Sequence, residues 1–266
     1  NTSDQISPHD LKDLMVENIY GVDIEKHSIE LSIFSLSVAL CSSFQSKEEN
    51  KYFLFEQLKK LKFPNLKGLN LHKGDFFQIR KDLINSDLRF DLIVGNPPFE
   101  EGFATQDQKD FDLKRTDEDG KLWTKTPGSN LAYLFLRAVL PLLKEGAKSC
   151  IVQPHGVLYN KGSHELQKSL FQNWKVREIL DFVSIPKLFC SRSGGKAPNA
   201  HAVSILIEKE EPTFETQRNT FKISYTVPEY DKFLITKFQY KLEGFYEHWS
   251  GWSTNSTTTF ENLPFG

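Results

Sequence analysis

Residues 90–99 have the sequence FDLIVGNPPF, and this stretch decides the fold. Its first six residues form a compact, mostly apolar run that predicts a buried β-strand. Two prolines follow, and proline continues neither a central strand nor a helix because it lacks a backbone N–H. The sequence therefore predicts a strand that ends abruptly at Asn96, with rigid backbone directly beyond its carboxyl end.

Strand-like and helix-like patterns alternate on both sides of this stretch. Strands are predicted at residues 18–24, 69–72, 148–153, 176–182 and 200–208, and helices at 8–18, 25–44, 130–143 and 163–173. Three further segments are predicted as a charged helical patch at 47–62, a short helix or loop at 76–88 and a long surface loop at 101–129. The strands lie mostly too far apart for hairpins, which predicts an α/β fold with a largely parallel, Rossmann-like sheet and helices on both faces.

The pattern changes beyond Pro212. Short β-like runs at 221–227 and 233–240 precede a polar tail that contains tryptophan. We therefore divide the chain into a domain of residues 1–210 and a β-rich extension of residues 211–266.

Composition bounds the class of protein. The 266 residues are 39% hydrophobic and carry a net charge of −2, which indicates a globular protein and argues against wholesale wrapping of nucleic acid. No apolar run approaches the roughly 18 residues of a membrane span, and no signal peptide is visible, so we expect a cytoplasmic protein. The three cysteines, Cys41, Cys150 and Cys190, are scattered and predict neither a disulfide framework nor a zinc site.

Two acidic residues lie at the ends of predicted strands, where ligands of such sheets bind. Asp23 precedes a helix and could accept hydrogen bonds from both hydroxyls of a ribose, or could cap the helix. Asp75, followed by Phe76, could accept from the amine of an adenine covered by the ring, or could be a turn residue after Gly74. The residues alone leave both alternatives open for each acid.

The tetrapeptide Asn96-Pro97-Pro98-Phe99 predicts a platform of hydrogen-bond acceptors. The Asn96 side-chain oxygen and the Pro97 carbonyl could together accept both hydrogens of a planar NH₂ group, while Phe99 stacks on its ring. An aromatic amine is a poor nucleophile, so positioning is the chemistry it needs, and a general base is not obligatory. The alternative is a proline turn with a core phenylalanine.

The order IYGVDIE (19–25), KGDFF (73–77), FDLIVGNPPF (90–99), SNLAYLFLRAVLPLLKEG (129–146) and QPHG (153–156) resembles the N6-adenine DNA methyltransferases that use S-adenosylmethionine. The likeness runs from Ile19 to Glu208 and is greatest to the large type I and type IIG restriction–modification enzymes and related phage-defence systems. It implies that DNA is the partner, that a specificity subunit or a fused recognition or nuclease domain accompanies the domain, and that methyl transfer needs no metal.

The resemblance also implies roles for individual residues. Asp23 would bind the cofactor ribose and Ile24 would pack on its adenine, while Asp75 would meet the adenine amine with Phe76 beside it. Residues 96–99 would hold the flipped-out target adenine, with Phe99 in place of the commoner tyrosine.

The resemblance has departures and less definite features. The family's glycine-rich cofactor loop should precede Ile19, where no such loop is present, so we expect a fragment that lacks the first strand of the sheet. Lys187, Phe189 and Lys196 lie in a basic connection where the family grips substrate, although Phe189 could equally be a core residue. His155 is a further candidate for a phosphate or cofactor contact.

Related chemistries fit the residues less well. A cytosine N4 enzyme would be expected to have serine in place of Asn96, and a C5 enzyme needs a Pro-Cys nucleophile that this sequence lacks. Protein-glutamine and RNA methyltransferases share the Asn-Pro-Pro-aromatic motif and remain alternatives. So does a catalytically incomplete fragment that binds DNA or serves as a scaffold.

Overall fold

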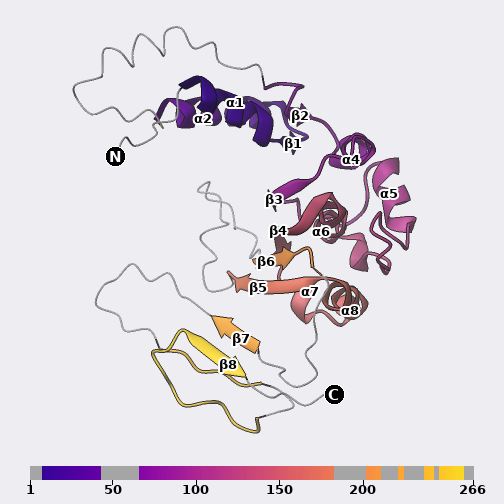
Figure 1. Ribbon diagram of the computed structural model, residues 1–266. Helices are drawn as coiled ribbons and strands as arrows, with labels where there is room; N and C mark the ends of the chain where they lie inside the picture. Colours follow the sequence, from indigo (N-terminus) through magenta and orange to yellow (C-terminus); the bar gives the residue numbers. More distant parts are fainter. Residues whose placement is uncertain are drawn as a thin grey trace, which may run out of the picture. The chain divides into compact units, whose positions relative to one another are not determined.

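The computed structural model describes residues 8–42, 66–182, 202–210, 221–224, 237–242 and 246–260 (Figure 1). The chain forms two compact units, residues 1–87 and 88–266. Each unit is described by itself below. The predicted charged helix at 47–62 lies outside the described residues.

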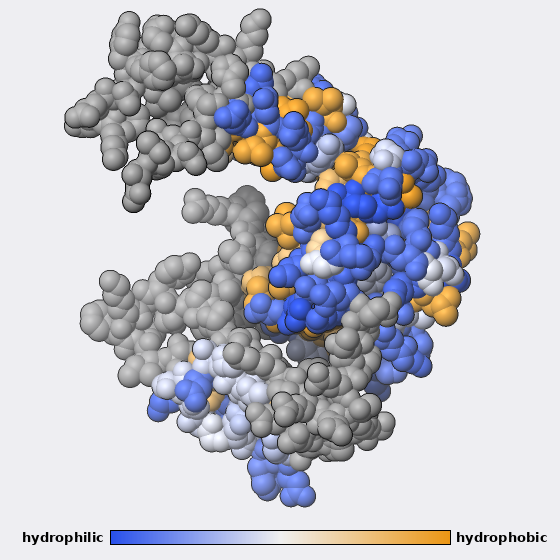
Figure 2. Space-filling view, in the orientation of Figure 1, coloured by the Kyte–Doolittle hydropathy of each residue, from blue (hydrophilic) through white to orange (hydrophobic). Residues whose placement is uncertain are grey.

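The first unit is built on two short parallel strands, β1 (Gly21–Asp23) and β2 (Leu71–Lys73). The described residues of this unit form the helices α1 (Pro8–Asn18), α2 (Lys26–Ser42) and α4 (Phe76–Asn85). The buried core unites α1, α2 and β2 through Met15, Ile29, Leu40, Leu66 and Leu71. A second apolar stripe of α2, formed by Leu31, Phe34 and Val38, is exposed, and apolar surface is visible beside α1 and α2 (Figure 2).

Gly21 allows the two strands of this unit to pack closely. A Cβ atom added at Gly21 would lie 2.8 Å from Cδ2 of the buried Leu71, which is closer than real Cβ contacts. We expect Gly21→Ala to lower the free energy of unfolding by about 1–3 kcal/mol, because overpacking displaces neighbouring side chains. Urea denaturation would measure this. Gly162→Ala is the control, since its Cβ would meet no atom within 4 Å, and an equal loss in both variants would contradict the explanation.

The second unit contains a four-stranded sheet in the order β3-β4-β6-β5. The strands are β3 (Phe90–Gly95), β4 (Leu143–Pro154), β5 (Lys175–Asp181) and β6 (Ala202–Glu208). Only β3 and β4 pair in parallel, whereas β6 lies antiparallel between β4 and β5. The prediction of a largely parallel sheet is therefore wrong for β6. Its continuous apolar run is buried in the centre, and the more charged β5 occupies the edge.

Helices cover one face of this sheet. The nearly fully buried α6 (Leu131–Val139) packs on β4, and α8 (His164–Asn173) packs beside β5. On the other face Leu92 and Val94 are 61% and 69% exposed, and among the described residues β3 pairs only with β4. The alternation of strands and helices confirms the predicted α/β, Rossmann-like class. The cover of helices on both faces stays a prediction, because the described residues of this unit place helices on one face.

The segment between β3 and α6 is folded, which corrects the prediction of a long surface loop. Helix α5 (Gln106–Leu113) begins at a capping box, in which Thr105 and Gln108 satisfy each other's backbone N–H groups. The base of the segment is closed by a 2.9 Å hydrogen bond from the Leu131 N–H to the Glu100 carbonyl. The polar composition of the segment gave no apolar periodicity from which a helix could be predicted. The motif Thr105-x-x-Gln108 was the one local pattern typical of a helix start.

The C-terminal region contains an antiparallel pair, β7 (Phe221–Ser224) with β8 (Thr257–Phe260). Of the run predicted at 233–240, residues 233–236 lie outside the described residues, and Phe238 forms an isolated bridge with Ser253. The domain boundary at 210/211 stays a prediction. Among the described residues, no helix combines the length and the apolar character that crossing a membrane requires.

Candidate active site

Asp23 is the last residue of β1, and its carboxylate caps the turn into α2. Its Oδ1 accepts a 2.7 Å hydrogen bond from the Glu25 N–H, and its backbone carbonyl accepts one of 3.0 Å from Gly74. The following Ile24 is 67% exposed, so its side chain is available to an apolar ligand surface.

Asp75 is the N-cap of α4. Its Oδ1 accepts a 2.8 Å hydrogen bond from the Phe77 N–H. Phe76 is half-buried, with its ring edge-on to that of Phe77 at 5.5 Å between centroids. The capping role considered for Asp23 is thus real, and Asp75, considered as a turn residue after Gly74, is also a helix cap. These capping roles do not exclude ligand binding, because a carboxylate has about four lone-pair directions.

The two acids share one edge of the first unit. Asp23 lies opposite Lys73 in the parallel register, and Asp75 follows Lys73 by two residues. The structure therefore brings together two carboxylates, an exposed aliphatic side chain and an aromatic ring. Their donor and acceptor chemistry fits an adenosine moiety, whose ribose hydroxyls and adenine amine are hydrogen-bond donors and whose ring has two apolar faces.

Residues 96–99 follow β3 directly in the second unit. Pro97 is buried and anchors the segment, whereas the side chain of Asn96 is exposed beyond the end of the strand. Phe99 is half-buried, so it is not the fully enclosed core residue of the alternative reading. The four residues form a rigid, solvent-accessible strand end with an amide side chain.

The segments that follow β3 and β4 pack against each other. The hydroxyl of Tyr133 in α6 lies 3.4 Å from the position that a Cβ at Gly156 would take. Burial raises the pKa of Tyr133, and a hydrogen bond with Ser163 opposes that rise. The nearby charge of Glu101, two residues after Phe99, raises it further. Tyr133 therefore connects α6 to the segment that follows β4.

Gln153 has a structural role. It is fully buried, and its Nε2 donates a 3.0 Å hydrogen bond to the carbonyl of Ala132, which ties β4 to α6. His155 follows the end of β4 and lies 3.3 Å from a carboxylate oxygen of Asp181. A phosphate or cofactor contact for His155 stays a prediction.

Tyr159, Asp181 and Arg137 were not predicted from the sequence patterns. Tyr159 stacks on His155, and the spacing of four residues could have signalled the pair. Arg137 is 1% exposed. Its position as a cation in a mostly apolar helix could have indicated a buried structural role. The predicted substrate residues Lys187, Phe189 and Lys196 lie outside the described residues.

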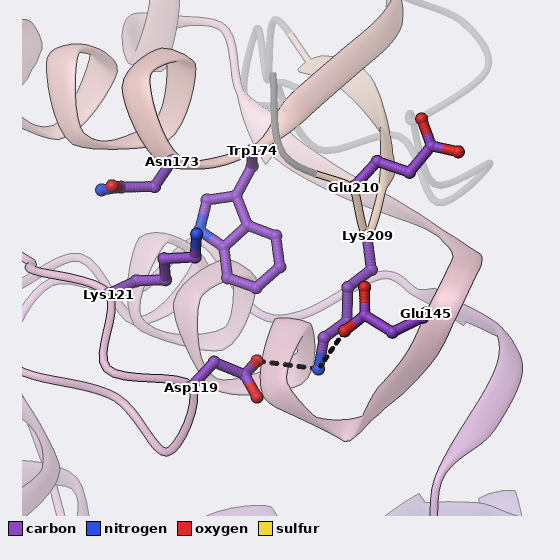
Figure 3. A pocket seen from close by; sticks show the side chains of 7 residues that line it. All are labelled: Asp119, Lys121, Glu145, Asn173, Trp174, Lys209 and Glu210. Carbon is purple, nitrogen blue, oxygen red and sulfur yellow. Dashed lines mark ion pairs between the residues drawn. The ribbon is translucent and has the colours of Figure 1, made fainter. Parts of the chain in front are cut away.

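A charged pocket of about 240 Å³ lies at the end of this sheet where β4 and β5 begin (Figure 3). Its lining includes Glu145 near the start of β4, Trp174 before β5 and Lys209 after β6. The Nζ of Lys209 lies 2.8 Å from Asp119 and 3.8 Å from Glu145, so its charge is neutralised locally. The pocket is lined by residues of the segment after β3 and by residues next to the sheet strands. The candidate base-binding residues 96–99 lie at the other end of the strands, where ligands of α/β sheets bind.

Comparison with known proteins identifies the family. Residues 17–189, well over half of the chain, match the family described as Eco57I restriction-modification methylase. The chain belongs to the Eco57I restriction-modification methylase family. No curated protein matches the sequence. The matched range contains both strand-end acids and the tetrapeptide at Asn96, so the family assignment covers the candidate active site of this methylase.

One solved structure shows the same fold at low sequence identity. The nuclease-deletion mutant of the type ISP restriction-modification enzyme LlaGI, in complex with a DNA substrate mimic, matches with a TM-score of 0.52 and 12% identity over 84% of this chain and 19% of that one. The M protein of the type I restriction enzyme EcoKI matches with a TM-score of 0.48 and 14% identity over 82% and 38%. A modification subunit of a putative type I restriction enzyme from Vibrio vulnificus YJ016 matches with a TM-score of 0.46 and 15% identity, over 86% of this chain and 48% of that one. The methylase chain thus spans less than half the length of each.

Among the described residues, no group of three or more His, Cys, Asp or Glu side chains is arranged to hold a metal ion.

Proposed function

We propose that this methylase transfers a methyl group from S-adenosylmethionine to the N6 amine of adenine in DNA, as a cytoplasmic component of a restriction–modification or phage-defence system. The observation that supports it is the exposed strand end Asn96-Pro97-Pro98-Phe99 in a chain of the methylase family. The LlaGI protein, which shares the fold, is a nuclease-deletion mutant of a restriction-modification enzyme and is in complex with a DNA substrate mimic. We therefore propose a specificity subunit or a fused recognition or nuclease domain as a partner.

The residues at this strand end supply positioning. The Asn96 side-chain oxygen and the Pro97 carbonyl accept the two N–H groups of a flipped-out adenine, and Phe99 stacks on its ring. The bound cofactor supplies an electrophilic methyl group and leaves as a neutral thioether. The new N–C bond uses the nitrogen lone pair while the C–S bond breaks, and one amine proton leaves to solvent, so no metal is required.

Direct product analysis tests the reaction. The chain is incubated with methyl-labelled S-adenosylmethionine and unmodified DNA, and the digested nucleosides are identified by mass spectrometry. We expect N6-methyladenine. Parallel reactions with RNA and with glutamine-containing protein test the two alternative substrates that share the motif, and label found only there, or in N4-methylcytosine, would overturn the proposal.

The cofactor site of the proposal is Asp23, Ile24, Asp75 and Phe76. We expect Asp23→Ala to weaken S-adenosylmethionine binding about tenfold to a hundredfold, because a hydrogen bond to a charged group contributes about 1.5–3 kcal/mol. Isothermal titration calorimetry would measure the change. Glu25→Ala, which removes an exposed neighbouring acid, should bind within about twofold of the unaltered chain. Equal weakening in both variants would argue against a specific role for Asp23.

A further inference from the structure

A cluster of three side chains lies beyond the ends of β4 and β5 in the second unit. The rings of His155 and Tyr159 are stacked, with 4.1 Å between centroids and 19° between planes. The Nε2 of His155 lies 3.3 Å from Oδ2 of Asp181, the last residue of β5. Tyr159 is nevertheless 64% exposed. A carboxylate thus orients an imidazole, and the imidazole supports one face of an exposed phenol ring.

The backbone beneath this ring is firmly anchored. His155 precedes the single turn α7 (Gly156–Tyr159) and Tyr159 is its last residue, so their spacing of four places them on one side of it. Val157 within the turn is 1% exposed, and its carbonyl accepts a 2.7 Å hydrogen bond from Gln167 of α8. The exposed ring of Tyr159 is therefore held by a buried residue and by a neighbouring helix.

The Tyr159 ring and Asn96 both lie at the end of the sheet where β3 and β4 end. Gly95 is opposite Ile151 in the parallel register of β3 and β4, so Asn96 falls three residues short of His155. Three residues of strand correspond to roughly 10 Å. This is about the length of three stacked nucleotides at 3.4 Å each along one strand of DNA. The ring is thus within reach of nucleotides that flank a base held at Asn96.

The chemistry of the cluster selects a base rather than a phosphate. The carboxylate of Asp181 repels a phosphate placed beside His155. Partial burial, and secondarily the charge of Asp181, raise the pKa of the Tyr159 hydroxyl, so this ring stays neutral. A neutral, supported and exposed aromatic face is suited to stacking on another flat ring, and every nucleobase offers one.

We propose that Tyr159 is a stacking platform for an unpaired nucleobase next to the target base, with His155 and Asp181 as positioning residues. The proposal rests on the proposed function in that it takes DNA as the substrate. It adds a second base-binding position to the one at Asn96 and Phe99.

Binding of a short single-stranded DNA containing 2-aminopurine tests the platform, because stacking quenches its fluorescence. With the full chain, we expect Tyr159→Leu to bind about tenfold more weakly and Tyr159→Phe to bind within about twofold of the unaltered chain. Phe171→Leu is the matched control, since Phe171 is an exposed aromatic residue of the same unit that precedes β5 and so lies toward the opposite edge. Equal binding by Tyr159→Leu and the unaltered chain, or no binding by the unaltered chain, would overturn the proposal.

A base deletion series locates the partner. Oligonucleotides with an abasic site at each position around one adenine are compared on the unaltered chain and on Tyr159→Leu. The affinity difference should disappear at one position, where the base that stacks on Tyr159 is missing. A difference that persists at every position would show that the substitution acts through the fold, and would refute the platform.

Quenching of 2-aminopurine fluorescence also tests the positioning role of His155. His155→Ala should weaken binding and reduce the quenching of 2-aminopurine, and His155→Phe should restore both because it keeps a stacked ring. Failure of His155→Phe to restore quenching would contradict the support by stacking.

These assays use neither cofactor nor methyl transfer, so the two proposals can fail separately. Base-dependent binding at Tyr159 without methylation of adenine would refute the proposed function alone. Methylation of adenine with unchanged binding by Tyr159→Leu would refute the platform alone.

Discussion

Replacement of Asn96 by alanine should lower the rate of methyl transfer to adenine by at least a hundredfold to a thousandfold. The substitution removes the side-chain oxygen that accepts one amine hydrogen, and loss of one preorganised hydrogen-bonding group in an active site costs about this much. The Pro97 carbonyl alone does not hold the amine in line with the methyl group. Because Asn96 is exposed beyond the end of β3, the fold should be retained.

The split between catalysis and cofactor binding is the informative readout. The Asn96→Ala variant should bind S-adenosylmethionine within about twofold of the unaltered chain, since the proposed cofactor residues are Asp23, Ile24, Asp75 and Phe76. Single-turnover transfer of labelled methyl groups and calorimetry measure the two quantities. Asn255→Ala, an exposed asparagine of the C-terminal region, is the control. Unchanged turnover in Asn96→Ala would eliminate the proposed role.

Replacement of Arg137 by alanine should lower the free energy of unfolding of the second unit by about 3–5 kcal/mol. Arg137 is 1% exposed in α6, and its guanidinium carbon lies 4.8 Å from the ring centroid of Phe111 and 5.8 Å from that of Trp123. Its Nη2 donates a hydrogen bond to the backbone carbonyl of Lys114. The substitution therefore leaves a cavity between two aromatic rings and removes a donor from a buried carbonyl.

Burial of the Arg137 charge is itself unfavourable, and this cost suggests a control variant. Burial lowers its pKa to about 10, with the attraction of Asp112 only partly opposing this effect. Among the described residues, its Nε and Nη1 have no hydrogen-bond partner. Arg137→Met keeps most of the volume and removes the buried charge, so it should be far less destabilising than alanine.

Denaturation by urea and hydrogen exchange in residues 105–126 would distinguish these outcomes. In Arg137→Ala the exchange should accelerate across the segment that contains Phe111 and Trp123. The segment's own bonds, such as the 2.7 Å hydrogen bond from the Trp123 indole to Asp117, should not prevent this, because they do not attach it to α6. Equal stability of the alanine variant and the unaltered chain would refute the anchoring role.

Much of the fold follows from local patterns. The run at 90–95 predicted β3 residue for residue, and the periodicity predicted one helix at 130–143, which the structure divides into α6 and the short turn η3 (Leu140–Leu142). Buried strands and amphipathic helices are encoded by neighbouring residues, so periodicity finds them. The antiparallel direction of β6 was not predicted, because it depends on β6 inserting between β4 and β5, which are distant in the sequence from one another.

The candidate site divides in the same way. Asp23, Asp75 and the tetrapeptide at Asn96 were found because each follows a strand, and strand ends can be located from sequence. The stacking of Tyr159 on His155 and the contact of His155 with Asp181 join residues of two different strand ends, and no local pattern specifies such contacts. Arg137 gave a signal only as an anomaly in an apolar helix.

By itself, the sequence determined the α/β alternation, the rigid proline-containing segment after β3 and the acids at the ends of β1 and β2, because each depends on residues adjacent in the chain. Only the tertiary structure decided that β6 inserts between β4 and β5, that the segment after β3 is folded onto Arg137, and that Tyr159 stacks on His155 as an exposed ring. These features depend on which surfaces meet when the strands assemble, and burial, charge neutralisation and ring stacking between distant residues determine that outcome.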